Sequence, residues 1–251
     1  NYICFESIFK LNQPNSVPNN HIFIYYQNAR GLCSKTHSFY VNACEMDFDI
    51  IVITESWLND SIQNSELFPS NYNIIRSDRK FNAVDKVIGG GVIAAISNKI
   101  NCQIINTTVI DDLVPLIDLC ICKCQYNTVT FLLVVCYIPP SVSSADYEIF
   151  LEGLEIFLVG QTALLIGDFN LSMFNTPSTT CSKVNSLRTF CDSLQLTQHN
   201  SIGNLNNRQL DLIFSNFRKI QVKREENPFV WEDPYHPTLS ITVEFLFQPE
   251  T

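Results

Sequence analysis

The sequence lacks any apolar run long enough to cross a membrane. A transmembrane helix needs roughly 20 consecutive apolar residues. No stretch approaches that length, so we expect no contact with a membrane. The sequence also lacks a basic start followed by an apolar stretch and a small-residue cleavage site, so no secretory signal is visible. It begins at Asn1 rather than Met, and we therefore expect a longer parent protein.

Charged residues are also scarce. They make up 16% of the 251 residues, whereas hydrophobic residues make up 46%. This balance is typical of a folded globular protein rather than a disordered one. The length allows one large domain or two small ones, and neither an internal repeat nor a break in composition divides the chain. We predict a polar leader or linker at residues 1–20 and a single domain at residues 21–248.

Basic residues are outnumbered by acidic ones, which gives a net charge of −9 and an isoelectric point near 4.8. A protein that binds nucleic acid mainly through phosphates usually carries a basic footprint, so any such contact must come from local patches. Each candidate basic residue is equally compatible with a solvated surface. Alternatively, part of the acidic excess is a carboxylate cluster that a divalent cation neutralises. The candidate basic residues are Arg76, Arg79, Lys80, Arg218, Lys219, Lys223 and Arg224.

The ten cysteines do not have the positions of a disulfide scaffold. Most lie inside apolar runs, where a free cysteine behaves as a small buried hydrophobe. The one cluster, Cys120, Cys122 and Cys124, has a period of two residues. That period favours one face of a strand over a zinc site, whose cysteines usually have two or more residues between them. We therefore expect reduced cysteines and an intracellular protein.

Residues 164–170 are the stretch around which the rest of the chain is organised. Three bulky aliphatic residues indicate a strand buried on both faces, and Gly167 ends the run. Asp168 and Asn170 follow two positions apart, so on an extended backbone both side chains project to one side. A carboxylate and a carboxamide that project together from the end of a buried strand suit a site for a phosphate or for a metal ion with its bound water. Because Gly, Asp and Asn are ordinary turn formers, a simple turn is the alternative.

Periodicity and turn residues predict many short strands and few helices. The three glycines at 89–91 precede a strand rather than a helix, and no Gly-Lys-Ser/Thr follows, so they are not a phosphate-binding loop. We expect them to let backbones pass closely. The elements together predict two sheets covered by helices. The predicted strands span residues 21–26, 49–54, 72–75, 92–96, 102–110, 117–124, 129–137, 164–166, 209–214, 220–223 and 239–247, and the predicted helices span residues 35–46, 146–158 and 184–194.

Polar side chains recur where the predicted strands end. Polar groups that gather at one edge of a sheet sandwich form a site. Carboxylates and amides suit a hard cation such as Mg²⁺, and a histidine with an aspartate partner suits proton handling or stabilisation of a transition state. Taken singly, Glu55 could cap a helix, Asp211 could accept a buried hydrogen bond, and His236 could lie at the surface. The residues of this set are Asn28, Glu55, Tyr137, Asp168, Asn170, Asp211 and His236.

Short motifs around these residues, taken in the order in which they occur along the chain, resemble those of the endonuclease/exonuclease/phosphatase superfamily. The closest similarity is to the endonuclease domain of non-LTR (LINE-type) retrotransposons, and it spans about residues 22–247. The resemblance implies an α/β (α+β) fold of the DNase I-like type. In that fold, a four-layer sandwich, two mixed β-sheets pack face to face and are flanked by helices. The matching segments are Gln27-Asn28-Ala29-Arg30-Gly31-Leu32, Thr54-Glu55-Ser56-Trp57, Gly89-Gly90-Gly91-Val92, Tyr137-Ile138-Pro139-Pro140, Gly167-Asp168-Phe169-Asn170, Leu210-Asp211-Leu212-Ile213-Phe214 and His236-Pro237.

The resemblance also implies roles for individual residues. Glu55 would ligate the metal with Asn28 beside it, and Asp168 would orient and deprotonate the attacking water. Asp211 would fix the imidazole of His236, which would stabilise charge developing on the phosphate. The phosphate or the leaving oxygen would be held by Asn170 and Tyr137. Contacts to DNA would come from Arg30, Arg79 and Arg208.

The sequence departs from the family pattern just before the histidine. The family usually has Ser-Asp-His, whereas this chain has Pro234-Tyr235-His236. A tyrosine donates a hydrogen bond but does not replace the charge of a carboxylate. Asp233 is the nearest acidic residue that would reach the metal in its place. The departure raises the alternative that activity is impaired.

The implied function is that of a Mg²⁺-dependent DNA endonuclease, with Mn²⁺ as a possible substitute. The enzyme would nick target DNA so that a downstream reverse transcriptase in the parent polyprotein primes from the nick, and it would act on genomic DNA in the nucleus. Two alternatives stay open. One is a phosphomonoesterase of the same fold, and the other is a catalytically impaired remnant or domesticated binding module.

Overall fold

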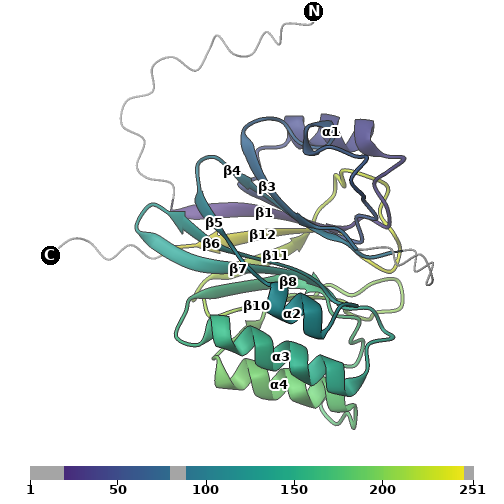
Figure 1. The fold of residues 1–251 in the computed structure, drawn as a ribbon, viewed down its shortest axis with the longest axis vertical. Coiled ribbons are helices and arrows are strands. Elements are labelled where there is room, and N and C mark those ends of the chain that lie inside the picture. The colour runs from purple at the N-terminus through teal and green to yellow at the C-terminus, as the bar shows by residue number, and fades with distance from the viewer. Residues whose placement is uncertain (1–19, 80–88, 246–251) are drawn as a thin grey trace, which may run out of the picture.

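The computed structural model describes residues 20–79 and 89–245 (Figure 1). Most of the predicted leader at 1–20, and the last residues of the predicted closing strand and domain, lie outside these ranges. The elements are β1 (His21–Asn28), α1 (Thr36–Glu45), β2 (Ile50–Thr54), η2 (Asn64–Glu66), β3 (Tyr72–Ser77), β4 (Val92–Ser97), β5 (Asn101–Ile105), α2 (Thr108–Leu113), β6 (Asp118–Tyr126), β7 (Val129–Tyr137), α3 (Ser144–Leu158), β8 (Ala163–Asp168), α4 (Ser182–Ser193), β9 (Thr197–Gln198), β10 (Asp211–Ser215), β11 (Ile220–Arg224) and β12 (Leu239–Glu244).

The described strands form two six-stranded sheets. The first sheet has the order β11-β12-β1-β2-β4-β3, and the second has the order β5-β6-β7-β8-β10-β9. Both sheets are mixed, because β1 and β2 are parallel in the first and β7 and β8 are parallel in the second. The remaining neighbours are antiparallel. A helix connects the strands of each parallel pair, namely α1 in the first sheet and α3 in the second.

The two sheets pack face to face, and helices cover their outer faces (Figure 1). Successive residues of a strand point to opposite faces, so each central strand serves two cores. On β8, Leu164 and Ile166 lie in the core between the sheets, whereas Leu165 lies in the core under α2, α3 and α4. On β1, Ile24 faces the second sheet and Tyr25 faces α1. The predicted four-layer sandwich is confirmed.

Helix α3 forms because its sequence provides both a cap and an apolar face. The Ser143 hydroxyl accepts a hydrogen bond from the backbone N–H of Asp146 at 3.1 Å and so satisfies one of the free donors of the first turn. The residues that α3 buries recur at a helical spacing and pack on the second sheet. They are Tyr147, Phe150, Leu151, Leu154 and Leu158.

The strand predicted at 102–110 is too long. β5 ends at Ile105, and residues 108–113 form α2 instead. The Asn106 side chain accepts a hydrogen bond from the backbone N–H of Thr108 at 2.9 Å, a local turn that competes with continuation of the strand. The following turn then buries Ile110 against α3, where Gly153 leaves room for it.

The cysteine cluster lies where the period of two places it. Cys120, Cys122 and Cys124 all face the core between the sheets, and the three are buried. In the described ranges, no group of potential metal ligands contains a cysteine. Among the helices of those ranges, none is long and apolar enough to cross a membrane.

Candidate active site

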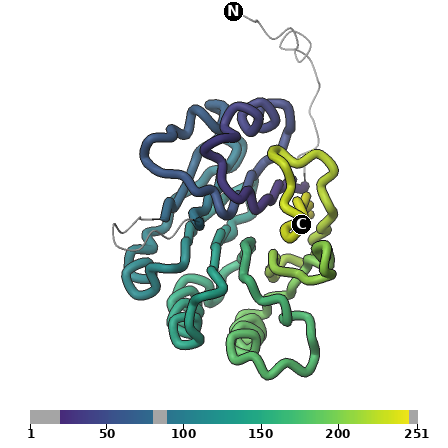
Figure 2. The backbone as a smooth tube through the Cα atoms, turned by 90° about the vertical axis from the view of Figure 1, so that its right-hand side faces the viewer, coloured from purple at the N-terminus to yellow at the C-terminus, as the bar shows by residue number. Residues whose placement is uncertain are grey.

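The strand ends that carry the predicted site residues meet at one edge of both sheets. This edge lies on the right in Figure 1 and faces the viewer in Figure 2. β1 and β2 are parallel and end level with each other, so Glu55 leaves the sheet beside Asn28. In the second sheet, Tyr137 at the end of β7 pairs with Asp168 at the end of β8. β10 is antiparallel to β8 and begins with Asp211 opposite Asp168.

His236 lies in the loop before β12 and joins the two sheets at this edge. Its Nδ1 lies 3.2 and 3.1 Å from the two carboxylate oxygens of Asp211, and 3.8 Å from Oδ2 of Asp168. The His236 side chain is only 7% exposed, and those of Asp168 and Asp211 are 0% and 3% exposed. The structure therefore contains the pairing of the Asp211 carboxylate with the imidazole that the sequence predicted.

Three carboxylates set the charge of this imidazole. Burial lowers the pKa of His236, but the neighbouring Asp211, followed by Asp168 and Glu55, outweighs that effect and raises the pKa to about 9. Burial, and then the negative charge of Asp211, raise the pKa of Asp168 well above its usual range. The metal-free site thus holds a charged imidazolium at neutral pH and favours the neutral form of Asp168.

Asn28 lies between the two carboxylates at the centre of the edge. Its Nδ2 donates to Oε1 of Glu55 at 3.2 Å and to Oδ2 of Asp168 at 3.0 Å. Its Oδ1 accepts the backbone N–H of Arg30 at 3.2 Å. A metal ligand must offer the amide oxygen, so in this arrangement Asn28 acts as a donor between the carboxylates.

Asn170 reaches the site by a different geometry from the one predicted. Its φ angle is 51°, so the backbone leaves the extended conformation after Asp168, and the prediction that both side chains project from one extended strand is wrong. The backbone N–H of Asn170 donates to Oδ1 of Asp168 at 3.0 Å, and its Nδ2 donates to the carbonyl of Ile138 at 3.0 Å. The side chain is thereby fixed beside the end of β7.

The donor set at the edge fits a hard divalent cation. Glu55, Asp168 and His236 offer ligand atoms that lie within 4.8 Å of one another. Within the described part of the chain, no lysine or arginine forms an ion pair with Glu55, Asp168 or Asp211. Converging carboxylates that no lysine or arginine neutralises are stabilised by a bound cation. Nδ1 of His236 is engaged by Asp211, and a hard cation prefers oxygen ligands, so Glu55 and Asp168 are the residues that would hold the ion.

Comparisons with known proteins show the fold. The structure matches the endonuclease domain of TRAS1, a telomere-specific non-LTR retrotransposon, with a TM-score of 0.66 and 13% identity, over 90% of this chain and 99% of that domain. It matches the AP endonuclease LMAP from Leishmania major with a TM-score of 0.62 and 9% identity, over 90% and 89% of the two chains. The catalytic domain of human Nocturnin, solved with bound sulfate, matches with a TM-score of 0.59 and 15% identity, over 90% and 94%.

The chain has the DNase I-like fold. This agrees with the resemblance predicted from the ordered motifs and with two mixed sheets flanked by a few helices. No protein-family model and no curated protein sequence matches the chain significantly. The likeness is therefore one of structure.

At the rim of the site, an ion pair fixes the loop before His236. Arg30 Nη1 lies 2.7 Å from Oδ2 of Asp233, and Oδ1 of Asp233 accepts the backbone N–H of Tyr235 at 2.7 Å. Burial raises the pKa of Asp233, but Arg30 and the Tyr235 N–H outweigh it and lower the pKa below its usual value. Both carboxylate oxygens are thus engaged, and Asp233 lies outside the Glu55, Asp168 and His236 group, contrary to the metal role expected from sequence.

The other two predicted DNA contacts differ in position. The Arg79 side chain is 9% exposed, and its guanidinium forms an ion pair with Asp118 at 2.5 Å and stacks 5.2 Å from the centroid of the Tyr137 ring. The structure therefore places Arg79 under the site rather than at a surface that DNA reaches. Arg208, in contrast, is exposed in the loop before β10.

Sequence reasoning missed Tyr26, which links the two sheets at the site. Its hydroxyl donates to Oδ1 of Asp211 at 2.5 Å and lies 3.0 Å from the Thr54 hydroxyl. Burial, and then the charge of Asp211, raise the pKa of Tyr26 well above its usual value, so the phenol stays protonated. The signal that would have found it is its spacing, because Tyr26 precedes Asn28 by two residues and both side chains point to one face of β1.

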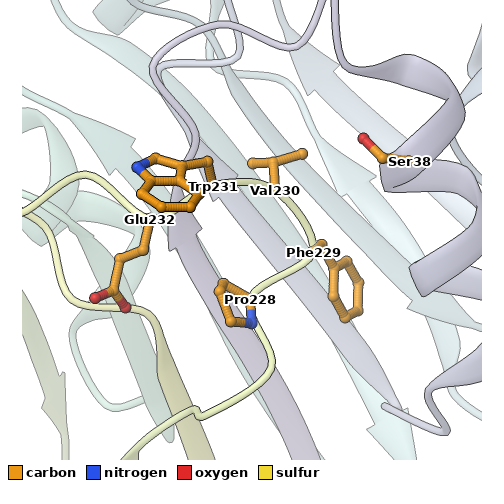
Figure 3. A pocket seen from close by; sticks show the side chains of 6 residues that line it. All are labelled: Ser38, Pro228, Phe229, Val230, Trp231 and Glu232. Carbon is orange, nitrogen blue, oxygen red and sulfur yellow. The ribbon is translucent and has the colours of Figure 1, made fainter.

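Two cavities border the loop between β11 and β12. One, of about 450 Å³, lies between Ser38 of α1 and residues 228–232 (Figure 3). Its only acidic residue, Glu232, accepts the backbone N–H of Thr238 at 2.6 Å and pairs with Arg224, so this cavity contains no free catalytic group. The second, of about 270 Å³, is nearer to His236 and includes Pro237 and Leu205. Trp231 lines both cavities.

Proposed function

We propose that this protein is a Mg²⁺-dependent phosphodiesterase that nicks one strand of DNA. The observation that carries the proposal is the Asp211–His236 pair, which faces Asp168 and Glu55 across the junction of the two sheets. An imidazolium beside converging carboxylates offers a positive charge for a phosphate, and Asp168, once ionised, would accept the proton of a water.

Each residue then has a definite task. Glu55 and Asp168 would hold the ion, which when bound would neutralise charge on the phosphate oxygens and favour the ionised form of Asp168. Asp168 accepts the proton of the attacking water. His236, kept charged and oriented by Asp211, donates a hydrogen bond to a phosphate oxygen. Asn170 and Tyr137 hold the phosphate or assist the leaving oxygen, as the sequence predicted.

Exposed apolar side chains beside His236 favour a nucleic acid over a small phosphate ester. Trp231 is 87% exposed, Leu205 is 78% exposed and Tyr235 is 47% exposed. The two loops that carry them are tied together, because the backbone N–H of Leu205 donates to the carbonyl of Pro234 at 3.1 Å. Aromatic faces stack on bases whatever the sequence, and exposed Arg30 and Arg208 supply positive charge nearby.

The test is the relaxation of supercoiled plasmid by the purified protein. We expect nicked circles with Mg²⁺ or Mn²⁺ and none with EDTA. His236→Ala and Asp168→Ala should reduce the rate at least about 100-fold, because each removes a group that acts on the transition state. The matched controls are His37→Ala and Asp192→Ala, which alter exposed residues on α1 and α4. Nicking that survives the first two substitutions would refute the proposal.

Two further outcomes separate the alternatives. Release of inorganic phosphate from a lipid or inositol phosphate, without relaxed plasmid, would identify a phosphomonoesterase. No activity would favour an impaired remnant or binding module, which Tyr235 motivates because it occupies the position where the related motifs have aspartate. In that case Tyr235→Asp restores nicking if the other groups are intact.

We also propose that the nick primes a reverse transcriptase from the same polyprotein and that the enzyme acts in the nucleus. The support is the similarity to the retrotransposon endonuclease domain, of which 99% is covered. A parent reading frame that continues past Thr251 into a reverse transcriptase would agree with this role. A complete parent without one would contradict it.

A further inference from the structure

The segment that carries Glu55 is held in an unusual conformation. Glu55 and Trp57 have φ angles of 49° and 54°, in the left-handed region that residues with side chains rarely adopt. Backbone hydrogen bonds fix the segment on both sides. The N–H of Gly31 donates to the carbonyl of Glu55 at 2.8 Å, and the N–H of Trp57 donates to the carbonyl of Gly90 at 3.0 Å.

This conformation turns the Trp57 ring back toward the carboxylate of Glu55. The indole Nε1 donates to Oε2 of Glu55 at 3.1 Å, while Asn28 donates to Oε1 at 3.2 Å. Each oxygen therefore has its own donor.

Two glycines lie beside the indole, and one of them leaves the space that the ring occupies. A Cβ atom at Gly31 would lie 2.7 Å from Cε3 of Trp57, and one at Gly89 would lie 3.7 Å from Nε1. The ring therefore excludes a side chain at Gly31, whereas the distance at Gly89 is an ordinary contact. Both glycines have positive φ angles, 91° and 121°, which favour glycine. The indole ring thus packs directly against the backbone of Gly31.

We propose that Trp57 is a positioning residue that orients the Glu55 carboxylate for the divalent cation. The inference rests on the proposed function, in which Glu55 holds the ion. An indole N–H is a neutral donor that neither ligates a metal nor loses its proton. It can therefore fix the direction of a carboxylate without neutralising it, whereas a lysine or arginine at the same place would compete with the cation for the charge. Partners of this kind orient metal ligands and tune their affinity.

The first experiment uses the unaltered protein. Its two tryptophans, Trp57 and Trp231, give two indole N–H signals in an ¹⁵N-labelled NMR spectrum, and Trp231→Phe assigns them. On titration with Mg²⁺ we expect the Trp57 signal to shift with saturation and the Trp231 signal to stay in place. If the chemical shift of the Trp57 indole N–H does not change when Mg²⁺ binds, the proposal is overturned.

The second experiment removes the donor but keeps an aromatic ring. We expect Trp57→Phe to weaken Mn²⁺ binding, measured by the electron paramagnetic resonance of free Mn²⁺, by about 10- to 100-fold. Trp231→Phe is the matched control and should bind Mn²⁺ like the unaltered protein. Wild-type Mn²⁺ affinity in a folded Trp57→Phe protein overturns the inference. If Trp57→Phe does not fold, the NMR titration alone decides.

A third variant distinguishes failure of this inference from failure of the proposed function. Glu55→Gln should lose Mn²⁺ binding. If Glu55→Gln binds Mn²⁺ with the affinity of the unaltered protein, the proposed metal site is wrong. The positioning role of Trp57 is then refuted as well. If Glu55→Gln loses binding but Trp57→Phe keeps it, the metal site stands and only the role of Trp57 is refuted.

Discussion

At the scale of single residues, the site depends on how buried charges balance one another. His236 is 6% exposed, and burial alone would favour its neutral form. The contact of Nδ1 with both oxygens of Asp211 reverses this preference. The imidazolium in turn reduces the cost of placing Asp168 and Asp211 opposite each other on β8 and β10.

The raised pKa of His236 predicts how stability depends on pH. In the folded, metal-free protein the pKa is about 9, against 6.5 for an ordinary histidine. Because the folded state binds the proton more tightly than the unfolded state, the stabilisation is fully present below pH 6.5 and is lost as pH rises to about 9. Urea unfolding in EDTA across this window measures it. A His236→Gln protein should lack this component, and an NMR pKa below 7 for His236 would contradict the prediction.

A second prediction compares two buried tyrosines. The hydroxyl of Tyr26 donates to Asp211, whereas the hydroxyl of Tyr147 on α3 has no hydrogen-bond partner among residues 20–79 and 89–245. Tyr26→Phe should lower the free energy of unfolding by about 1–3 kcal/mol, because it removes a hydrogen bond to a buried carboxylate. Tyr147→Phe should be neutral or stabilising. Equal effects in denaturant melts would show that Asp211 does not depend on Tyr26.

At the scale of elements, the site is positioned by the close approach of β7 and β8. A Cβ atom at Gly167 would lie 2.0 Å from the carbonyl oxygen of Cys136 on the neighbouring strand. Only glycine allows the two parallel strands to pair at this point, one residue before Asp168. The glycine that interrupts the apolar run in the sequence thus permits close pairing of the strands.

Gly167→Ala should therefore destabilise the protein by about 1–3 kcal/mol and displace Asp168. At equal concentrations of folded protein, we expect Gly167→Ala to nick DNA more slowly than the unaltered protein. Loss of stability alone would not explain such a difference. The control is Gly160→Asn, since Gly160 has a φ angle of 71° and nothing within 4 Å of its Cβ position. Asparagine tolerates that conformation, so the control should cost about 1 kcal/mol or less. If Gly167→Ala changes neither stability nor nicking activity, then close pairing of β7 and β8 at this point is not required.

Strand ends were predictable from sequence because their signals are local. An apolar run followed by Glu55, or by Asp168, identifies both the strand and the polar group that leaves it. Contacts between elements carry no such signal. Arg79 pairs with Asp118, which is 39 residues away in the sequence. The sequence therefore did not show this ion pair, and Arg79 was predicted to contact DNA. Helix α2 was missed because hydrogen bonds of Asn106 outweigh β-branched residues that favour a strand.

At the scale of the whole molecule, the net charge of −9 limits how DNA is bound. Each phosphate neutralised adds about −0.9 to the slope of log K against log salt concentration. With Arg30 and Arg208 as the exposed contacts, we expect a shallow slope of about −2, measured by fluorescence anisotropy with EDTA to prevent cleavage. Arg208→Ala should reduce its magnitude by about 1. A slope of −6 or steeper would reveal a basic surface elsewhere.

Trp231 provides the contrasting variant. Its indole is uncharged and 87% exposed, so its contribution should come from stacking rather than from counterion release. We expect Trp231→Ala to weaken DNA binding by about 1–3 kcal/mol at every salt concentration and to leave the slope unchanged. Unaltered affinity would exclude this loop from the DNA contact.

The order of strands in the first sheet has a consequence for biosynthesis. β1 lies between β2 and β12, which are its neighbours in the sheet, and β1 and β12 are the first and the last strands described. A nascent or truncated chain that ends before His236 would contain Glu55 and Asp168 but would lack both the imidazole and β12. Without β12, one edge of β1 would be open. The proposed cutting activity thus requires that nearly the whole segment has been translated.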